Sequence, residues 1–139
     1  MSPGGPNPSC PFCQRVESGE GLGPSTEQSV SFPDAFPVSE GHMLVIPRRH
    51  VARAEELSEE EWADLFALVK VVTAEVAAVP GVEGVNVGLN SGEAAGQTVF
   101  HAHVHVIPRR PGDVEDPRGG VRGVIPATAD YWSEGNGDD

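Results

Sequence analysis

Aromatic and basic side chains are both scarce in this sequence of 139 residues. Aromatic residues make up 6%, so the core is expected to consist of valine, alanine and leucine rather than aromatic rings. Nine lysines and arginines against 21 acidic residues give a formal net charge of −12. Such a surface repels polyanions, which argues against nucleic acid and anionic membranes as partners. A small anionic ligand stays compatible, because the field inside a site can differ from the overall charge.

The sequence also lacks a long hydrophobic run. No stretch approaches the roughly 18 apolar residues that a transmembrane helix needs. The N-terminal segment MSPGGPNPS has neither a basic region nor an apolar core, so it does not resemble a secretory signal. These absences predict a cytoplasmic protein without a membrane partner. Its two cysteines should then stay reduced unless they bind metal or cycle during catalysis.

Length and composition predict one folded domain with unstructured ends. A chain of this size can bury a core without disulfides or other staples. Residues 1–9 are rich in proline, glycine and serine and are expected to be disordered, and residues 127–139 are expected to form an acidic tail. The folded domain is therefore predicted over residues 10–126.

Hydrophobic patterns predict strands at residues 29–32, 42–47, 84–90 and 99–107. A long helix is predicted over residues 58–79, where Ser58 and Glu61 form a capping-box pattern and the dipeptide PG ends the run. Its apolar face is expected to comprise Trp62, Leu65, Phe66, Val69, Val72, Thr73 and Val76. The length of this helix indicates that part of it contacts a partner subunit. Strands joined by short turns around one helix predict an α+β domain with an antiparallel sheet.

Three of the five histidines fall within HAHVHVIPRR, residues 101–110. On a straight strand, His101, His103 and His105 would project from one face, with neighbours about 6–7 Å apart. One metal ion, with ligands at about 2.0–2.1 Å, could accept a neighbouring pair but not all three. The row could be a half-exposed strand, a metal-binding ladder or a catalytic row. The catalytic row is favoured, because imidazole can act as nucleophile, acid or base near neutral pH.

The pair CPFC, Cys10 and Cys13, allows three interpretations. A thioredoxin-type redox pair needs a strand before it, where this sequence has only a disordered-looking segment. A disulfide conflicts with a reducing compartment. The third interpretation is half of a structural zinc site, which needs two further ligands.

Antiparallel pairing of the second and fourth predicted strands would supply those ligands. The end of one strand then lies opposite the start of the other, so His50 meets His101. Cys10, Cys13, His50 and His101 are therefore the predicted ligands of a structural Zn²⁺. The same pairing brings the other ends of the two strands together, and with them His42 and His105.

The segment QTVFHAHVHVIP resembles the signature of the histidine triad (HIT) superfamily, in which three histidines alternate with apolar residues. GHMLVIPRRH is similar to the family's strand and turn ahead of its long helix, and CPFC is similar to its zinc-bearing members. The similarity spans roughly residues 10–110. It implies an α+β fold with a five-stranded antiparallel sheet, one long helix and a short N-terminal helix, assembled as a homodimer. It also implies a cleft for a nucleotide and chemistry at the nucleoside α-phosphate.

The resemblance assigns catalytic roles to individual residues. His103, the middle histidine, would attack the phosphorus and form a nucleotidyl-histidine that water then cleaves. His105 would face the phosphate or the leaving group, and His42 would fix its tautomer. Thr98 and the backbone amides around Gln97 would donate to phosphate oxygens, because Gly96 lets the backbone approach closely.

The resemblance assigns substrate contacts as well. Asn90 matches a position that binds the phosphates, Asp34 one that binds the ribose hydroxyls, and Phe32 one that lines the base pocket. Asp34 and Asn90 could instead be ordinary turn residues. The expected base is a purine, with adenine first, although Ala35 stands where some members carry a bulkier apolar residue and leaves the preference open.

The leading prediction is a nucleotide hydrolase. Its substrate would be a dinucleoside polyphosphate, as in the Fhit-like branch of the family, or a nucleoside phosphoramidate, as in the Hint-like branch. The context GQTV…HVHVIPRRPGD favours the former. Mg²⁺ is expected only to screen a polyphosphate substrate. The alternatives are a nucleotidyltransferase and a nucleotide-binding sensor or interaction protein with little turnover, although the intact middle histidine argues against the sensor.

Overall fold

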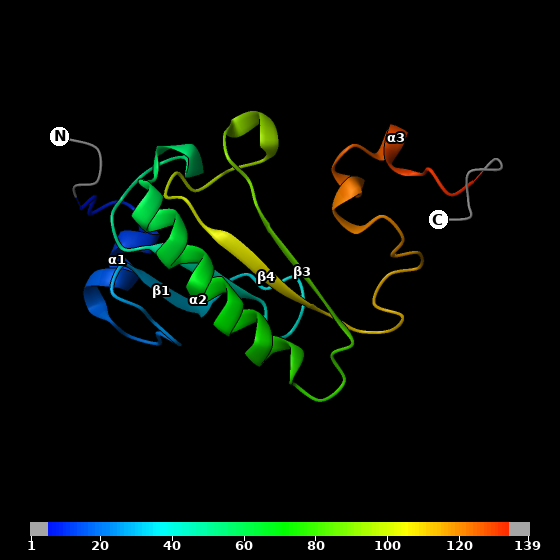
Figure 1. The fold of residues 1–139 in the computed structure, drawn as a ribbon, viewed down its shortest axis with the longest axis horizontal. Helices are drawn as coiled ribbons and strands as arrows, with labels where there is room; N and C mark the ends of the chain where they lie inside the picture. Colours follow the sequence, from blue (N-terminus) through cyan, green and yellow to red (C-terminus); the bar gives the residue numbers. More distant parts are fainter. Residues whose placement is uncertain (1–5, 134–139) are drawn as a thin grey trace.

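The computed structural model describes residues 6–133, which form one antiparallel sheet with a long helix across one face (Figure 1). The helices and strands in chain order are α1 (Pro11–Ser18), β1 (Ser29–Pro33), β2 (Met43–Pro47), α2 (Glu59–Ala77), β3 (Gly84–Leu89), β4 (Val104–Arg109) and α3 (Pro126–Ala129). The predicted disordered residues 1–9 and acidic tail 127–139 fall partly on residues 1–5 and 134–139, which lie outside the described residues.

The strand order is β1-β2-β4-β3, and all three pairs are antiparallel. This confirms the α+β class, and it supplies the antiparallel pairing of β2 with β4 on which the predicted zinc ligand set depends. The sheet has four strands within residues 6–133, so the expected five-stranded sheet is wrong. The segment ahead of β1 makes only an isolated bridge, between Ser25 and Val30. Pro24, beside that bridge, has no N–H to donate to a ladder, which explains why the bridge does not extend into a strand.

The histidine segment differs from the predicted strand at its start. β4 begins at Val104, where pairing with both β2 and β3 begins. His101 and His103 therefore precede the strand, and only the third histidine of the row lies on it. Ahead of the strand, the Ala102 N–H donates to the Val51 carbonyl at 2.7 Å. That bond holds the chain against the segment after β2, so the row is not straight.

The start of α2 is as predicted. The Ser58 hydroxyl accepts from the Glu61 N–H at 3.1 Å, and the Glu61 carboxylate accepts from the Ser58 N–H at 2.9 Å. The buried apolar face is Leu65, Leu68, Val69, Val72 and Val76. Leu68 thus takes the inward position predicted for Phe66, which is 39% exposed on the flank of the helix. Among residues 6–133, neither α2 nor any other helix is long and apolar enough to cross a membrane.

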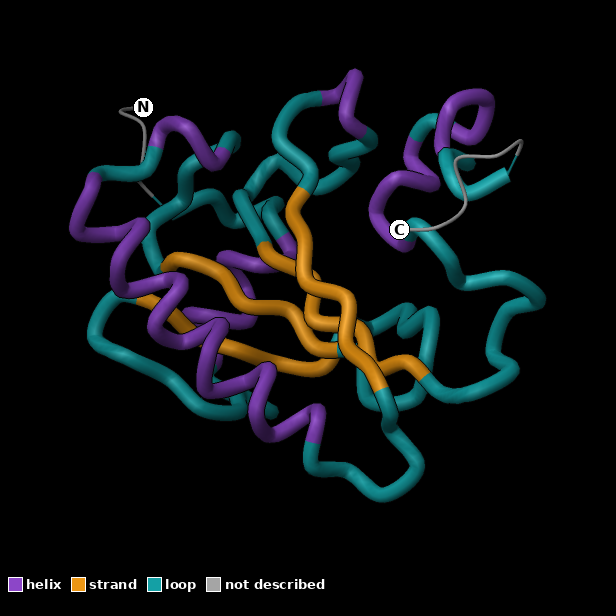
Figure 2. The backbone as a smooth tube through the Cα atoms, turned by 45° about the vertical axis from the view of Figure 1, so that its right-hand side comes forward, coloured by secondary structure: helices purple, strands orange, loops and turns teal. Residues whose placement is uncertain are grey.

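The two faces of the sheet carry separate apolar clusters. Val45, Val104 and Val106 pack with the buried face of α2, which crosses that side of the sheet (Figure 2). The cluster on the opposite face comprises Val30, Phe32, Leu44 and Ile46, with Phe12, Val16 and Leu22 packed against it. His105 pairs with Leu44 across β4 and β2 and therefore lies on this second face, together with α1.

Beyond β4 the chain forms a short arm that contains α3 (Figures 1 and 2), and the turn at Gly120–Val124 in this arm contacts β3. Arg118 lies over the Trp132 ring at 4.9 Å, and Arg122 lies over the Tyr131 ring at 4.6 Å. Val124 and Ile125, at the end of the RGGVRGVIP segment, are 79% and 61% exposed. The arm lies apart from the predicted site residues.

Candidate active site and metal centre

A cavity of about 770 Å³ opens on the α1 face of the sheet, within the size range of small-molecule sites. The predicted site residues that line it are Phe32, Asp34, His42, Asn90, Thr98, His103 and His105. Helix α1 adds Phe12 and Arg15, which the sequence predictions missed. The signal was present in CPFC, because a metal-bound Cys10 and Cys13 would fix the start of that helix beside the cavity.

His103 is held in one tautomer by a backbone carbonyl. Its Nδ1 lies 2.8 Å from the carbonyl oxygen of His101, and the side chain is almost fully buried. A carbonyl can only accept, so Nδ1 carries the proton and Nε2 keeps its lone pair. Burial lowers the pKa of His103 below its usual value, against the opposing effects of that carbonyl and of Asp34. The imidazole is therefore neutral near pH 7, which is the form that a nucleophile needs.

His42 and His105 form a hydrogen-bonded pair whose direction is set by the backbone. The Val38 N–H donates to His42 Nδ1 at 3.2 Å, so the proton of His42 is on Nε2. Nε2 donates to His105 Nδ1 at 2.9 Å, which places the proton of His105 on its own Nε2. Burial, followed by the neighbouring His103 and His42, lowers the pKa of His105 to about 4. His105 is therefore a neutral hydrogen-bond donor near pH 7.

Asp34 combines the turn role and the site position that the sequence left as alternatives. Its Oδ1 accepts from the Phe36 N–H at 2.8 Å, which is ordinary turn chemistry. Its Oδ2 lies 3.4 Å from His42 Nε2, at the cavity. Asn90 and Thr98 also line the cavity, on the segments that follow β3 and precede β4.

The Gln97 side chain is buried and bonded to backbone groups. Its side chain is 2% exposed and is not part of the described cavity wall. Oε1 accepts from the Gly92 N–H at 2.8 Å, and Nε2 donates to the carbonyls of Ala52 and Val99 at 2.6 and 3.0 Å. Its own N–H donates to the Gly92 carbonyl. Gln97 therefore shapes the loop that presents Thr98, and its own side chain and N–H are hydrogen-bonded within the protein.

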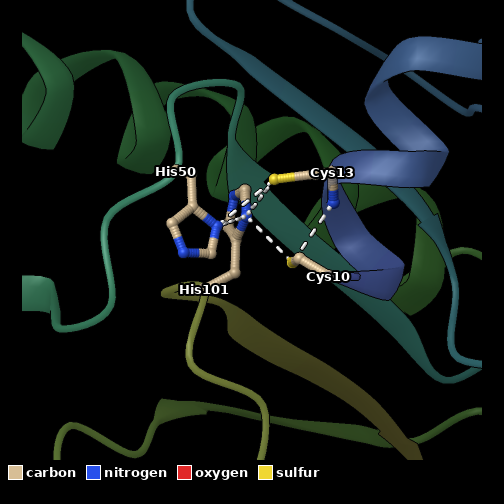
Figure 3. Close-up of side chains that lie close together, drawn as sticks. All are labelled: Cys10, Cys13, His50 and His101. Atoms are coloured by element: carbon tan, nitrogen blue, oxygen red, sulfur yellow. Dashed lines mark hydrogen bonds between the residues drawn. The ribbon is translucent and has the colours of Figure 1, made fainter. Parts of the chain in front are cut away.

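The four predicted zinc ligands converge on one point (Figure 3). His50 Nδ1 and His101 Nδ1 are 3.3 Å apart. Cys13 Sγ lies 3.2 Å from His50 Nδ1, and the sulfurs of Cys10 and Cys13 each lie 3.6 Å from His101 Nδ1. A tetrahedral zinc ion with bonds of about 2.0–2.1 Å to nitrogen and 2.3 Å to sulfur has N–N edges of about 3.3 Å and N–S edges of about 3.6 Å. The donor set and its spacing fit zinc.

His101 is also in the correct tautomer to bind a metal. Its Nε2 lies 2.7 Å from the Pro47 carbonyl oxygen and therefore carries the proton, which leaves the Nδ1 lone pair facing the other three ligands. Burial lowers the pKa of His101 to about 4, so the ring is neutral near pH 7. Cys10 Sγ accepts from the Cys13 N–H at 3.4 Å, and both cysteines are free thiols.

A second group has metal-like spacing but the wrong tautomer. Single ligand atoms of Asp34, His42 and His105 also lie within 4.8 Å of one another. If His42 Nε2 bound a metal, the neutral ring would carry its proton on Nδ1. That proton would point at the Val38 N–H, which can only donate. The group therefore suits hydrogen bonding to a substrate rather than metal binding.

The chain is similar in sequence to a known domain family and to several known proteins. The HIT domain matches residues 24–112. An adenosine 5′-monophosphoramidase of Schizosaccharomyces pombe is 43% identical over 103 residues, which cover 73% of this chain and 74% of that protein. An asymmetrical bis(5′-nucleosyl)-tetraphosphatase of the same organism is 41% identical over 91 residues, or 66% of this chain and 50% of that protein. The chain spans only 21% of a nitrilase and fragile histidine triad fusion protein of Caenorhabditis elegans, at 42% identity over 92 residues.

A solved structure shares the fold. A zinc-bound histidine triad family protein from Mycobacterium smegmatis superimposes with a TM-score of 0.68 at 36% identity, over 78% of this chain and 80% of that one. The domain match covers more than half of the chain, and it includes all three histidines of the row. This chain therefore belongs to the HIT family.

Proposed function

We propose that the chain is a nucleotide hydrolase that cleaves at a nucleoside α-phosphate through a covalent nucleotidyl-His103 intermediate. The observation that carries the proposal is the free lone pair on His103 Nε2. The hydrogen bond from Nδ1 to the His101 carbonyl fixes this tautomer, and the buried His103 ring lines the cavity. The names of the phosphoramidase and tetraphosphatase relatives support hydrolysis of a nucleotide substrate.

The reaction takes two displacement steps. His103 Nε2 attacks the α-phosphorus, the N–P bond forms, and the bond to the leaving group breaks with its electron pair on the leaving group. His105 donates a hydrogen bond from Nε2, and Thr98 one from its hydroxyl, to the oxygens where negative charge grows. Water then attacks the phosphorus and loses a proton. The N–P electron pair returns to Nε2, and the nucleoside monophosphate leaves.

A dinucleoside polyphosphate is the proposed substrate in preference to a phosphoramidate. An amine must take up a proton as it leaves, whereas a phosphate can leave as an anion. Burial lowers the pKa of His105, so near pH 7 the ring is a neutral imidazole that donates a hydrogen bond from Nε2 and not the imidazolium that would protonate a leaving amine. Mg²⁺ is proposed as a counter-ion of the polyphosphate, since the chain itself has a charge of −12.

The remaining cavity residues are proposed to hold the nucleoside. Asp34 would accept from the ribose hydroxyls, because a carboxylate has acceptor sites for both. Asn90 would donate to the phosphates. Phe12 and Phe32, whose rings meet edge to face at 5.6 Å, would form the wall for a purine. Adenine is the proposed base, in line with the adenosine in the name of the phosphoramidase relative.

The test of the enzyme proposal uses α-phosphate-labelled dinucleoside polyphosphate and nucleoside phosphoramidate. We expect acid-labile label on the wild-type protein and none on His103→Ala, with faster turnover of the polyphosphate. Binding without adduct or turnover would show a nucleotide-binding protein instead. Transfer of the label to an added phosphate or sugar in preference to water would show a nucleotidyltransferase.

Structural Zn²⁺ is proposed at Cys10, Cys13, His50 and His101. The tetrahedral spacing and the zinc-bound family member support it. Both cysteines must be thiolates for this, which fits a reducing compartment such as the cytoplasm. Metal analysis is expected to find one zinc per chain in the wild type and in the Ser9→Ala control. Cys10→Ser should hold little or none, and an unchanged content would refute the site.

The homodimer is proposed to form along β3. This strand is at the edge of the described sheet, and pairing with a second copy would join two sheets. Asp64 bonds Thr26 and Ser29 beside β1, so the flank of α2 that carries Trp62 and Phe66 lies on the opposite side, towards β3. Their stacked rings, 5.5 Å apart, offer an apolar contact next to that edge.

A further inference from the structure

We propose that the metal centre positions the nucleophile, acting on the His103 ring through Phe12 and through the backbone carbonyl of His101. The inference rests on the proposed function and extends the role of the centre beyond fastening the N-terminal segment to the sheet. Two independent connections carry it, one through a side chain and one through the main chain.

The first connection is the Phe12 ring, which lies between the two cysteines in the chain. It meets the His103 imidazole edge to face, with centroids 5.0 Å apart and planes at 78°. His105 meets the same imidazole at 5.1 Å and 69°. The proposed nucleophile therefore has two ring neighbours, Phe12 and His105. Metal bound to Cys10 and Cys13 would fix the chain on both sides of Phe12, and so would hold the Phe12 ring in its contact with His103.

The second connection is His101, which belongs to both sites. Its Nδ1 faces the three other ligands, and its carbonyl oxygen accepts a hydrogen bond from the Nδ1–H of His103 at 2.8 Å. Its Nε2 is already held by the Pro47 carbonyl at 2.7 Å. With both ring nitrogens engaged, His101 has little freedom to turn its carbonyl away from His103. The bond that keeps the lone pair on His103 Nε2 thus depends on a residue that the metal would anchor.

A purely structural centre would behave differently. Loss of metal would then lower the stability of the fold but would leave the His103 ring unchanged wherever the fold persists. A positioning role requires that the Nδ1–H of His103 loses protection and that kcat falls while the fold is intact. A misplacement of the nucleophile by a fraction of an ångström to 1 Å is enough to cost about tenfold or more in rate.

The test separates the Phe12 ring from the metal. Phe12→Leu keeps all four ligands, and Phe12→Tyr keeps the ring as well. We expect Phe12→Leu to hold one zinc per chain, to lose about tenfold in kcat and to show faster solvent exchange of the His103 Nδ1–H by proton NMR. Phe12→Tyr should restore both values. Phe36→Leu is the matched control, because Phe36 lines the cavity but has no ring contact with His103 among the described residues; it should change KM and leave exchange unchanged.

Metal removal tests the same coupling without a substitution. Chelation of the wild-type protein, where circular dichroism shows that the fold persists, should speed the Nδ1–H exchange and lower kcat. KM should rise as well, because α1 also carries part of the cavity wall. If either kcat or exchange is unchanged in Phe12→Leu, or if metal-free protein keeps both, the proposal is wrong. A wild type that forms no nucleotidyl-histidine would refute the proposed function instead, and the exchange measurement would still decide the inference.

Discussion

The backbone around each histidine selects which ring nitrogen that residue presents. Carbonyls of Pro47 and His101 hold protons on His101 Nε2 and His103 Nδ1, and the Val38 N–H keeps a proton off His42 Nδ1. As a result, His101 directs a lone pair at the proposed metal site, and His103 keeps one on Nε2, at the cavity. His105 presents an N–H there instead. One residue type thus supplies three different functional groups.

The proposed contact of Asp34 with the ribose can be tested at this scale. Asp34→Ala is expected to raise KM for a ribonucleotide substrate by roughly tenfold, because a hydrogen bond to a charged group contributes about 1.5–3 kcal/mol. KM for the 2′-deoxy analogue should change much less, because one of the two hydroxyls is already missing. Steady-state kinetics with both substrates checks this.

Asp34→Asn is the matched control, since its side-chain oxygen can still accept from the Phe36 N–H and keep the turn. If Asp34→Ala raises KM equally for both substrates, Asp34 acts through the turn or through His42 rather than through the ribose. At the residue scale, a sequence motif points directly to side chains, as it does for the row of histidines. The sequence did not show the contact made by Phe12 or the buried hydrogen bonds of Gln97, because hydrogen bonding and burial depend on neighbours distant in the chain.

At the scale of the elements, α2 is fastened at its start by Glu61. This carboxylate closes the capping box and also accepts two bonds of 2.7 Å from the Arg49 guanidinium, on the segment after β2. These bonds, with Arg49 first, hold the pKa of Glu61 at about 2. The sequence shows the cap, because its spacing is local. It does not show Arg49, which reaches the helix only through the fold.

The fastening predicts a pH dependence of stability. The pKa of Glu61 is lower in the folded protein than in the unfolded chain, so its contribution is fully present above about pH 4.5 and is lost as the pH falls towards about 2. Glu61→Gln should lower the free energy of unfolding by about 2 kcal/mol at pH 7, after allowance for screening at the partly exposed Arg49. Urea unfolding of both proteins at several pH values measures the difference.

The difference between wild type and Glu61→Gln should shrink steadily below pH 4.5. Glu60→Gln, in the same turn but exposed, serves as the control and should differ little from wild type at any pH. If the difference in the free energy of unfolding stayed constant down to pH 3, the packing of the Glu61 side chain, and not its charge, would stabilise the cap.

At the scale of the whole molecule, the charge of −12 and the acidic surface leave few places where a second copy could approach. The β3 edge offers unpaired backbone groups, and the adjoining flank of α2 offers the apolar rings of Trp62 and Phe66. Phe66 was predicted to face the core, because sequence periodicity alone cannot tell a core contact from a contact with a partner chain. Phe66 is 39% exposed within one chain, and a subunit contact would bury this exposed surface.

Sedimentation velocity tests the homodimer. The wild type is expected to sediment with twice the chain mass of 14.6 kDa, and Phe66→Glu to shift towards a single chain. Val71→Glu is the matched control, because Val71 is 45% exposed but lies on the β1 side of the helix. A monomeric wild type, or equal dissociation by both substitutions, would contradict the proposed interface.

The sequence by itself determined the α+β class and the capped long helix, and it indicated that the two cysteines would meet His50 and His101 if β2 and β4 paired antiparallel. All of these follow from local periodicity, from turn chemistry or from residues at the ends of paired strands. Only the tertiary structure decided that the sheet has four strands, that β4 begins after His103 and that Leu68 faces inward in place of Phe66. It also decided which nitrogen each histidine presents, because a tautomer depends on backbone groups, such as the carbonyl of Pro47 and the N–H of Val38, that folding brings to the ring.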